Sequence, residues 1–332
     1  MGDALGLRGR HSRGRRTEQG DTLMLPNFIM IGAAKAGTTA LYWYLAEHPQ
    51  VFMSPMKETN YFAYGLDQQG NLLYGDPELH RFRVRSWSEY EALFARAGGA
   101  AAIGEVSPIY LECPQAAARI RGRLPSVRII CGLREPVDRA YSDYLMYLRS
   151  RGRSLEPERD LTATSEWALP DSHWMQIGRY HEMLSRYFDA FPREQIHIFL
   201  FDDLRRDPLG VIRDMYGFLG VDPTFHQDLE TPHNVGGVPA NMRLERILTS
   251  HRIRTIVEPL IPKGVVDRVR RVRTRNLRPA PSLPAELRNE LMGHFRDDIG
   301  KTSELIGRSL EPWLEPASPR SGHVDGRSLP RT

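Results

Sequence analysis

The sequence predicts an α/β protein with a central parallel sheet flanked by helices on both faces, that is, a three-layer sandwich. Short apolar runs typical of buried parallel strands alternate with stretches of helical periodicity along most of the chain. The first apolar run is followed directly by a glycine-containing loop and a helix, the order that builds a phosphate-binding turn. The chain has 332 residues, of which 41% are hydrophobic, and this suits one large α/β domain or two modest ones.

The expected elements follow one another in βαβ order, which predicts that ligands bind at the carboxyl ends of the strands. The expected strands are residues 28–32, 51–53, 101–105, 127–133 and 196–201. The expected helices are residues 39–47, 87–97, 113–123, 136–149, 178–191 and 209–219. Ser88 and Glu91 have the spacing of a capping box at the start of the helix at 87–97. Pro136 suits the first turn of its own helix.

Both ends of the chain differ in composition from the part between them. Residues 1–22 carry five arginines and five glycines without an apolar period, so we expect a disordered basic tail, with contact to an anionic surface as the alternative. Residues 316–332 are rich in Pro, Ser, Gly and Arg, and we expect a flexible C-terminal tail. Residues 23–315 then form the single predicted domain.

Composition argues against several classes of protein. No run approaches the roughly 18 apolar residues of a membrane span, and no apolar core follows the N-terminal charges as in a signal peptide. Cys113 and Cys131 are the only cysteines, so a disulfide framework is not expected. No cluster has metal-ligand spacing, so we expect no metal. A reducing, cytoplasmic setting is the simplest interpretation.

The loop GAAKAGTT at residues 32–39 follows the first strand and resembles a nucleotide-binding P-loop without matching it. Gly32 and Gly37 have the spacing of the pattern G-x-x-x-x-G-K-[ST], and Thr39 stands at the hydroxyl position. Thr38 replaces the expected lysine, and Lys35 lies two residues before the second glycine instead. The sequence therefore predicts a P-loop-like fold whose loop holds a phosphate but is not arranged for ATP hydrolysis.

A second candidate phosphate site follows the strand at 127–133. Arg134 closes this strand, and Ser142 lies eight residues on, in the next helix, where it can turn back towards the strand end. A guanidinium and a hydroxyl can share one phosphate. A nucleoside triphosphatase needs a metal-binding aspartate at such a strand end, and this strand ends in arginine. Two phosphate sites without a magnesium carboxylate point to 3′-phosphoadenosine 5′-phosphosulfate (PAPS) as the nucleotide.

At this point the chain resembles the PAPS-dependent sulfotransferases, nearest the branch of the heparan sulfate sulfotransferases with its bacterial members. The likeness covers residues 24–315, with motifs in the family's order and spacing. It rests on the loop at 35–39, on the segment PMKETNYF at 55–62, on LREP at 133–136 with Arg139, Ser142 and Tyr144, and on GRY at 178–180, FDDL at 201–204, Asp207-Pro208 and FLGV at 218–221.

The resemblance implies a role for each matching residue. Lys35 neutralises charge on the leaving phosphate, and Glu58 is the general base that deprotonates the acceptor hydroxyl. Arg134 and Ser142 hold the 3′-phosphate. The 5′-phosphosulfate is held by Ala36, Gly37, Thr38 and Thr39. The product nucleotide is then 3′-phosphoadenosine 5′-phosphate, and the reaction requires no metal.

Each of these residues also has a plainer interpretation. Lys35 could be a solvated loop lysine, Glu58 a helix-start carboxylate or the partner of Lys57, and Arg134 the partner of Glu135 or Asp138. Ser142 could be an ordinary helix serine. Lys57 either contacts the sulfuryl group or only neutralises Glu58.

The segment GEVSPIY at 104–110 departs from the heparan enzymes, which have a lysine where Val106 stands. This puts a heparan-type acceptor in doubt. Glu105 is a candidate for acceptor contact, with a buried structural carboxylate as the alternative. Trp174 is a further candidate, because residues 150–177 could form an acceptor lid or a packed surface excursion.

Two late segments add weaker candidates. The loop TPHNVGGVPANMR at 231–243 offers nucleotide contacts from Asn234, Gly236 and Gly237, with a plain surface loop as the alternative. Residues 267–278 carry six arginines, which form a solvated basic face or a docking surface for an anionic acceptor, membrane or carrier. Nucleic acid is not expected, because aromatic residues are not interleaved.

The predicted function is therefore transfer of a sulfuryl group to a hydroxyl of a small molecule, glycan or glycolipid. An arginine-rich chain without an anchor suggests a bacterial enzyme of secondary-metabolite or carbohydrate sulfation. The alternatives are a P-loop kinase or nucleoside triphosphatase, and a nucleotide-binding module without catalysis. The sequence fixes neither the acceptor nor the oligomeric state.

Overall fold

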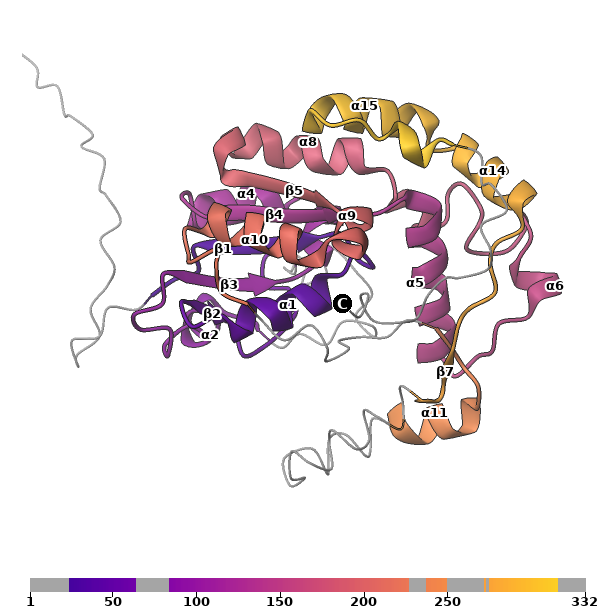
Figure 1. Cartoon of the computed structure of the whole chain (residues 1–332), viewed down its shortest axis with the longest axis horizontal. Coiled ribbons are helices and arrows are strands. Elements are labelled where there is room, and N and C mark those ends of the chain that lie inside the picture. The colour runs from indigo at the N-terminus through magenta and orange to yellow at the C-terminus, as the bar shows by residue number, and fades with distance from the viewer. Residues whose placement is uncertain (1–23, 64–83, 227–236, 250–271, 273–274, 316–332) are drawn as a thin grey trace, which may run out of the picture.

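The computed structural model describes residues 24–63, 84–226, 237–249, 272 and 275–315. Its centre is a five-stranded parallel sheet with the strand order β2-β3-β1-β4-β5 (Figure 1). The strands are β1 (Phe28–Gly32), β2 (Val51–Met53), β3 (Ala102–Val106), β4 (Arg128–Leu133) and β5 (Ile196–Leu200). In the register, Ile29 of β1 lies opposite Glu105 of β3 on one side and Ile129 of β4 on the other.

Helices connect the strands and cover the sheet. Those between β1 and β5 are α1 (Thr38–Glu47), α2 (Trp87–Ala92), α3 (Ile109–Glu112), α4 (Ala116–Arg123), α5 (Pro136–Ser150), α6 (Pro157–Asp160), α7 (His173–Gln176) and α8 (Tyr180–Ala190), with the 3-10 turn η1 (Arg193–Gln195). After β5 come α9 (Phe201–Arg206), α10 (Pro208–Leu219), α11 (Met242–Thr249), α14 (Ala285–Gly293), α15 (Arg296–Ile306) and the turn η3 (Glu311–Trp313). A short antiparallel pair, β6 (Val238–Pro239) with β7 (Leu277–Arg278), lies between α10 and α14 in the chain.

The side chains of the sheet alternate between two apolar clusters, as strand geometry requires. On β1, Phe28 and Met30 belong to a cluster with residues of α1 and α10, whereas Ile29 and Ile31 belong to a larger cluster with residues of α4, α5 and α8. Every residue of β1 and β3 is buried. Both faces of the sheet are therefore covered, which confirms the predicted three-layer sandwich.

The C-terminal helices complete one layer. Figure 1 shows α15 running beside α8 above the sheet. The carboxylate of Asp298 on α15 accepts hydrogen bonds from the backbone N–H groups of Tyr180 at 2.8 Å and His181 at 3.2 Å, in the first turn of α8. An anionic group at a helix N-terminus is favourable because the unpaired N–H groups there carry partial positive charge.

Three predicted boundaries were wrong. The capping box of α2 is Ser86 with Glu89 rather than Ser88 with Glu91, and α2 ends at Ala92 instead of continuing to residue 97. The helix expected at 113–123 begins only at Ala116, because Cys113 is extended and a separate short helix, α3, precedes it. The two tails expected at 1–22 and 316–332 lie outside the described residues.

Candidate functional site

The glycine loop leads from the buried strand β1 into α1, as the sequence predicts. Gly37 is the N-cap of α1 with a φ of +86°, and Lys35 has a φ of +72°, so both take the left-handed region. A Cβ added at Gly37 would lie 2.6 Å from Cδ2 of Leu204. Glycine is therefore required at this position for two reasons, the backbone conformation and the close approach of α9.

The N-terminus of α1 is arranged to accept an anion. Among the described residues, no side chain caps this helix, and its first turn contains no acidic residue. Thr38 is buried in the first turn, with Thr39 partly buried beside it, and Ala36 is fully buried just before Gly37. The first N–H groups of an α-helix have no partner within the helix, so they are available to a phosphate group.

Lys35 extends from this loop towards α5. Its Nζ lies 3.3 Å from the thioether sulfur of Met146. Desolvation lowers the pKa of the ammonium from 10.5 to about 8, and the nearby cations Arg134 and Arg149 act in the same direction, while Asp143 opposes them. The loop lysine therefore stands in a partly desolvated environment between β1 and α5, which differs from the solvated alternative.

Arg134 joins the two predicted phosphate sites. Its Nη1 donates a hydrogen bond of 3.1 Å to the backbone oxygen of Lys35, and its guanidinium lies 4.7 Å from the centre of the Phe201 ring. The Arg134 carbonyl accepts a hydrogen bond of 2.8 Å from the hydroxyl of Tyr180. Burial lowers the pKa of the guanidinium, as expected for a cation taken from water. The end of β4 and the loop after β1 are thus held together directly.

Ser142 lies on α5, one turn before Met146, and is partly buried. Residues four apart on a helix share a face, so the Ser142 hydroxyl and the thioether that contacts Lys35 lie on one side of α5. The hydrogen bond from Arg134 to the Lys35 backbone joins those two residues, and a place for Ser142 beside them stays a prediction.

The carboxylates of Glu135 and Asp138 do not pair with Arg134, which was the plainer alternative from sequence. Arg288 of α14 forms ion pairs with both, at 3.0 Å from Glu135 and in a shorter contact with Asp138. Arg288 lies 153 positions from Glu135 in the chain. No local pattern in the sequence could have identified it.

Glu58 lies in the segment after β2, which runs beside the end of β3. Its backbone N–H donates a hydrogen bond of 2.9 Å to the carbonyl of Val106. Its side chain is 48% exposed and forms an ion pair with Lys57. Lys57 therefore neutralises Glu58 in this structure, in agreement with one of the two interpretations. Val106 itself is fully buried in the cluster beneath α1, so its side chain lies in the core rather than at the surface.

Glu105 and Trp174 lie where the structural alternatives placed them. Glu105 has no exposed surface and accepts four hydrogen bonds from hydroxyl groups. Trp174 is partly buried against Tyr144 and Tyr147 of α5, with ring centres 5.3 and 5.2 Å away, and its carbonyl accepts a hydrogen bond from Arg139.

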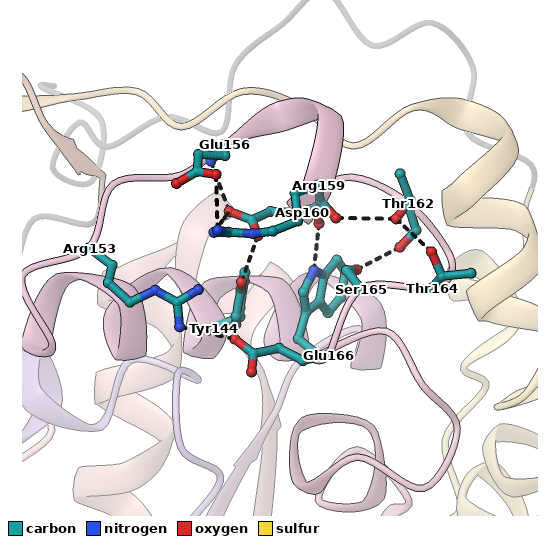
Figure 2. A network of polar contacts seen from close by, with 10 residues as sticks. Tyr144, Arg153, Glu156, Arg159, Asp160, Thr162, Thr164, Ser165 and Glu166 are labelled. Carbon is teal, nitrogen blue, oxygen red and sulfur yellow. Dashed lines mark hydrogen bonds and ion pairs between the residues drawn. The ribbon is translucent and has the colours of Figure 1, made fainter.

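The excursion at 150–177 is tied to α5 by a polar network (Figure 2). Asp160, buried, accepts a hydrogen bond of 2.9 Å from the Tyr144 hydroxyl and pairs with Arg159 at 2.7 Å. The indole N–H of the fully buried Trp167 donates a hydrogen bond of 2.7 Å to the Asp160 carbonyl, and the Trp167 ring packs on Tyr144 with ring centres 5.9 Å apart. This part of the chain is packed against the domain in the structure.

The remaining sequence candidates are only partly described. Gly237 has a φ of +142°, and a Cβ there would lie 2.5 Å from the carbonyl oxygen of Arg278, so β7 packs closely on it. Asn234 and Gly236 lie outside the described residues, as does most of the arginine run at 267–278. Across the described ranges no group of His, Cys, Asp and Glu could hold a metal ion. Within the same ranges, no helix has the length and apolar character needed to cross a membrane.

A pocket opens along the C-terminal half of α5, with about 530 Å³ of empty volume that includes space open to solvent. Apolar side chains and two arginines line it: Leu145, Leu148, Arg149, Arg153, Leu155, Val238 and Met242, with Ser154, Pro157, Pro239 and Pro281. Arg149 is also one of the cations that lower the pKa of Lys35.

Comparison with known proteins agrees with this geometry. Residues 26–226 match the sulfotransferase family. The membrane-associated sulfotransferase kil1 of Dictyostelium discoideum is 24% identical over 319 residues, covering 70% of this chain and 64% of the relative. The bifunctional heparan sulfate N-deacetylase/N-sulfotransferase 4 of Mus musculus is 27% identical over 310 residues, covering 87% of this chain and 31% of the relative. The chain thus spans less than two thirds of the length of either relative.

A third relative is the heparan sulfate glucosamine 3-O-sulfotransferase 3B1 of Mus musculus, 31% identical over 200 residues, which covers 59% of this chain and 46% of the relative. Among solved structures, a sulfotransferase from Alicyclobacillus acidocaldarius superimposes with a TM-score of 0.63 at 28% identity, covering 88% of this chain and all of that one. The fold, the order of the motifs and these matches agree, and the chain belongs to the sulfotransferase family.

Proposed function

We propose that this protein transfers a sulfuryl group from PAPS to a hydroxyl group of a small-molecule, glycan or glycolipid acceptor. The observation that carries the proposal is the hydrogen bond of 3.1 Å from Arg134 to the backbone of Lys35, since it joins a loop for one phosphate to a cation for a second. A donor nucleotide with phosphates at both its 5′ and 3′ positions fits such a pair. The hydroxyl preference goes beyond the relatives, which include N- and O-sulfotransferases.

The chemistry of the site fits this nucleotide. The uncapped N-terminus of α1 and the left-handed backbone at Gly37 present N–H groups to a 5′-phosphosulfate. The Arg134 guanidinium and the Ser142 hydroxyl supply a cation and a donor for a 3′-phosphate. β4 ends at Leu133 and is followed by Arg134 rather than by a metal-binding aspartate, which argues against the kinase or triphosphatase alternative.

The nucleotide, when bound, supplies the sulfuryl group and a phosphate leaving group. Lys35 neutralises the negative charge that develops on that phosphate as its bond to sulfur breaks. Glu58 accepts the proton of the acceptor hydroxyl as the new sulfur–oxygen bond forms. With a pKa of about 8, Lys35 carries its charge in most molecules at neutral pH. Lys57 holds the Glu58 carboxylate until an acceptor arrives.

The acceptor class rests on the pocket beside α5. Its apolar lining favours an acceptor with an apolar part. A glycolipid or an amphiphilic secondary metabolite has such a part. The two arginines of the lining already have carboxylate partners, Arg149 with Glu245 at 3.8 Å and Arg153 with Glu166 at 3.5 Å. The buried Val106, in place of the lysine of the heparan enzymes, agrees with an acceptor other than a heparan chain. A cytoplasmic location stays a prediction.

The proposal is tested by donor turnover with a panel of hydroxyl compounds that contains phenols, sugars, a fatty alcohol and a glycolipid. Products one sulfuryl group heavier are sought by mass spectrometry, and turnover is counted as release of 3′-phosphoadenosine 5′-phosphate, so that water also counts as an acceptor. We expect Glu58→Gln to retain nucleotide affinity and lose about 100-fold or more in turnover, the usual contribution of a general base.

Glu286→Gln on α14 is the matched control, because Glu286 is exposed and belongs to another part of the chain. We expect it to behave as the wild type. Near-normal turnover of Glu58→Gln contradicts the assigned base. Nucleotide binding without transfer to any compound or to water supports the non-catalytic alternative instead.

A further inference from the structure

We propose that Glu105 is a positioning residue that acts through Thr59 to hold the backbone of Glu58 in the orientation needed for proton transfer. The inference rests on the proposed function, because it takes Glu58 as the general base. Glu105 lies at the end of β3, directly beneath the segment that carries Glu58. Its role is thus distinct from acceptor contact, for which its carboxylate is too deeply buried.

The segment that carries Glu58 has an unfavourable backbone. Glu58 has a φ of +60° and Asn60 a φ of +56°, so two non-glycine residues in three adopt the left-handed region. For Glu58 this costs about 1–2 kcal/mol relative to the right-handed conformation, whereas asparagine adopts it more readily. A conformation of this kind persists only where the surrounding structure holds it. The contacts on either side of Glu58 therefore decide where its carboxylate points.

Those contacts converge on Glu105. Its Oε2 accepts hydrogen bonds from the Thr59 hydroxyl at 2.6 Å and the Ser107 hydroxyl at 2.8 Å. Its Oε1 accepts from the hydroxyls of Tyr90 at 2.7 Å and Tyr110 at 3.0 Å. Four donated O–H groups match the four acceptor positions of an ionised carboxylate. Burial raises the pKa of Glu105 above its ordinary value, and the four hydrogen bonds offset part of that rise.

The same hydroxyls also hold the backbone around Glu58. The Ser107 oxygen accepts from the N–H of Asn60 at 3.1 Å, and the Tyr110 oxygen accepts from the N–H of Phe62 at 3.3 Å. The Ser107 and Tyr110 hydroxyls thus each donate a hydrogen bond to Glu105 and accept one from a backbone N–H of the segment. The carboxylate therefore fixes the orientation of both hydroxyl groups. Thr59, next to Glu58, is bound to Glu105 without an intermediate group.

Two isosteric substitutions separate positioning from general stability. Thr59→Val and Tyr90→Phe each remove one hydroxyl donor from the Glu105 carboxylate, and both side chains are fully buried. Thr59 lies in the segment of Glu58, whereas Tyr90 reaches Glu105 from α2. A purely structural role for Glu105 predicts similar consequences for the two variants. Thr59→Ser restores the hydroxyl and serves as the conservative rescue.

We expect Thr59→Val to lower turnover by about 10- to 100-fold, because a catalytic group displaced by about 1 Å loses on that order of rate. Affinity for 3′-phosphoadenosine 5′-phosphate should stay within about twofold, since the loop at 32–39 is not touched. Tyr90→Phe and Thr59→Ser should stay within about threefold of wild-type turnover, as expected where the base keeps its position. Turnover is expressed per nucleotide-binding molecule, so that partial unfolding does not count as lost catalysis.

Hydrogen–deuterium exchange provides a readout that needs no acceptor. The amides of Glu58 and Asn60 donate hydrogen bonds within the domain, and we expect them to exchange faster in Thr59→Val than in Tyr90→Phe or the wild type. Equal exchange and equal turnover in Thr59→Val and Tyr90→Phe overturn the inference.

The two proposals fail separately. If Glu58→Gln abolishes turnover while Thr59→Val does not, the positioning role is wrong and the sulfotransferase assignment stands. If Glu58→Gln turns over normally, the base assignment is wrong, whatever the exchange measurement shows.

Discussion

The close approach at Gly37 allows the most quantitative prediction for the phosphate loop. In Gly37→Ala, an L-residue must take a φ of +86°, which costs about 1–2 kcal/mol. The new Cβ also meets Cδ2 of Leu204 at 2.6 Å, and overpacking of this kind costs about 1–3 kcal/mol. We therefore expect Gly37→Ala to lower the free energy of unfolding by about 2–5 kcal/mol.

Gly99→Ala provides a matched control for the backbone term. Gly99 has nearly the same φ, +85°, but a Cβ there meets nothing within 4 Å. Gly99→Ala should therefore lower the free energy of unfolding by only about 1–2 kcal/mol, so the difference between the two variants isolates the contact with Leu204. Urea denaturation of both variants, followed by circular dichroism, measures this difference.

The double variant Gly37→Ala/Leu204→Ala tests the contact itself. Because Leu204→Ala removes the clashing methyl group, the double variant should be less destabilised than the sum of the single variants, by about 1–3 kcal/mol. Additive effects, or equal losses in Gly37→Ala and Gly99→Ala, refute the reasoning. Gly37→Ala should also weaken nucleotide binding, since Gly37 begins the helix that presents N–H groups to the phosphate.

Two further predictions concern charge. The folded-state pKa of Lys35, about 8, lies below its ordinary 10.5, so burial of the ammonium destabilises the fold below pH 8, and this penalty is relieved between about pH 8 and 10.5. Nucleotide affinity measured by calorimetry should nevertheless fall as the pH rises above about 8, because the ammonium is lost there. Lys35→Met should show no such fall. Arg288→Met leaves Glu135 and Asp138 without their cation and should lower the free energy of unfolding in urea by about 3 kcal/mol. Arg308→Met removes an arginine that is 45% exposed in its ion pair, and should lower the free energy of unfolding by at most about 1 kcal/mol. Similar losses of stability in the two variants contradict the structural role of Arg288.

The fold was predictable because its signals are local. Apolar runs predicted the five strands of the central sheet to within one or two residues, and their alternation with helices predicted the parallel three-layer order. The boundary errors have local causes as well. Residues 86–91 offer two Ser–Glu pairs with capping-box spacing, and only the extended backbone of Ser86 selects the first. Pro114 follows the extended Cys113, which divides the expected helix into α3 and α4.

The candidate site was predictable only where its residues lie close in sequence. The glycine loop and the end of β4 could be predicted as two phosphate sites from their own motifs. The contact of Lys35 with Met146 joins residues 111 positions apart, and no pattern in either motif indicates it. The network around Glu105 draws its donors from three segments, and its hydroxyls look like ordinary serine, threonine and tyrosine until the fold brings them together.

The central claim is that the site binds a nucleotide with phosphates at both the 5′ and the 3′ positions. Calorimetry with 3′-phosphoadenosine 5′-phosphate and with adenosine 5′-monophosphate, both in a chelator, measures the contribution of the 3′-phosphate. We expect the first nucleotide to bind at least about tenfold more tightly, from charge-assisted hydrogen bonds to the 3′-phosphate. Arg134→Ala should remove most of that preference, whereas Arg213→Ala, at an exposed position of α10, should retain it. Equal affinity for the two nucleotides, or turnover of ATP that requires magnesium, contradicts the account.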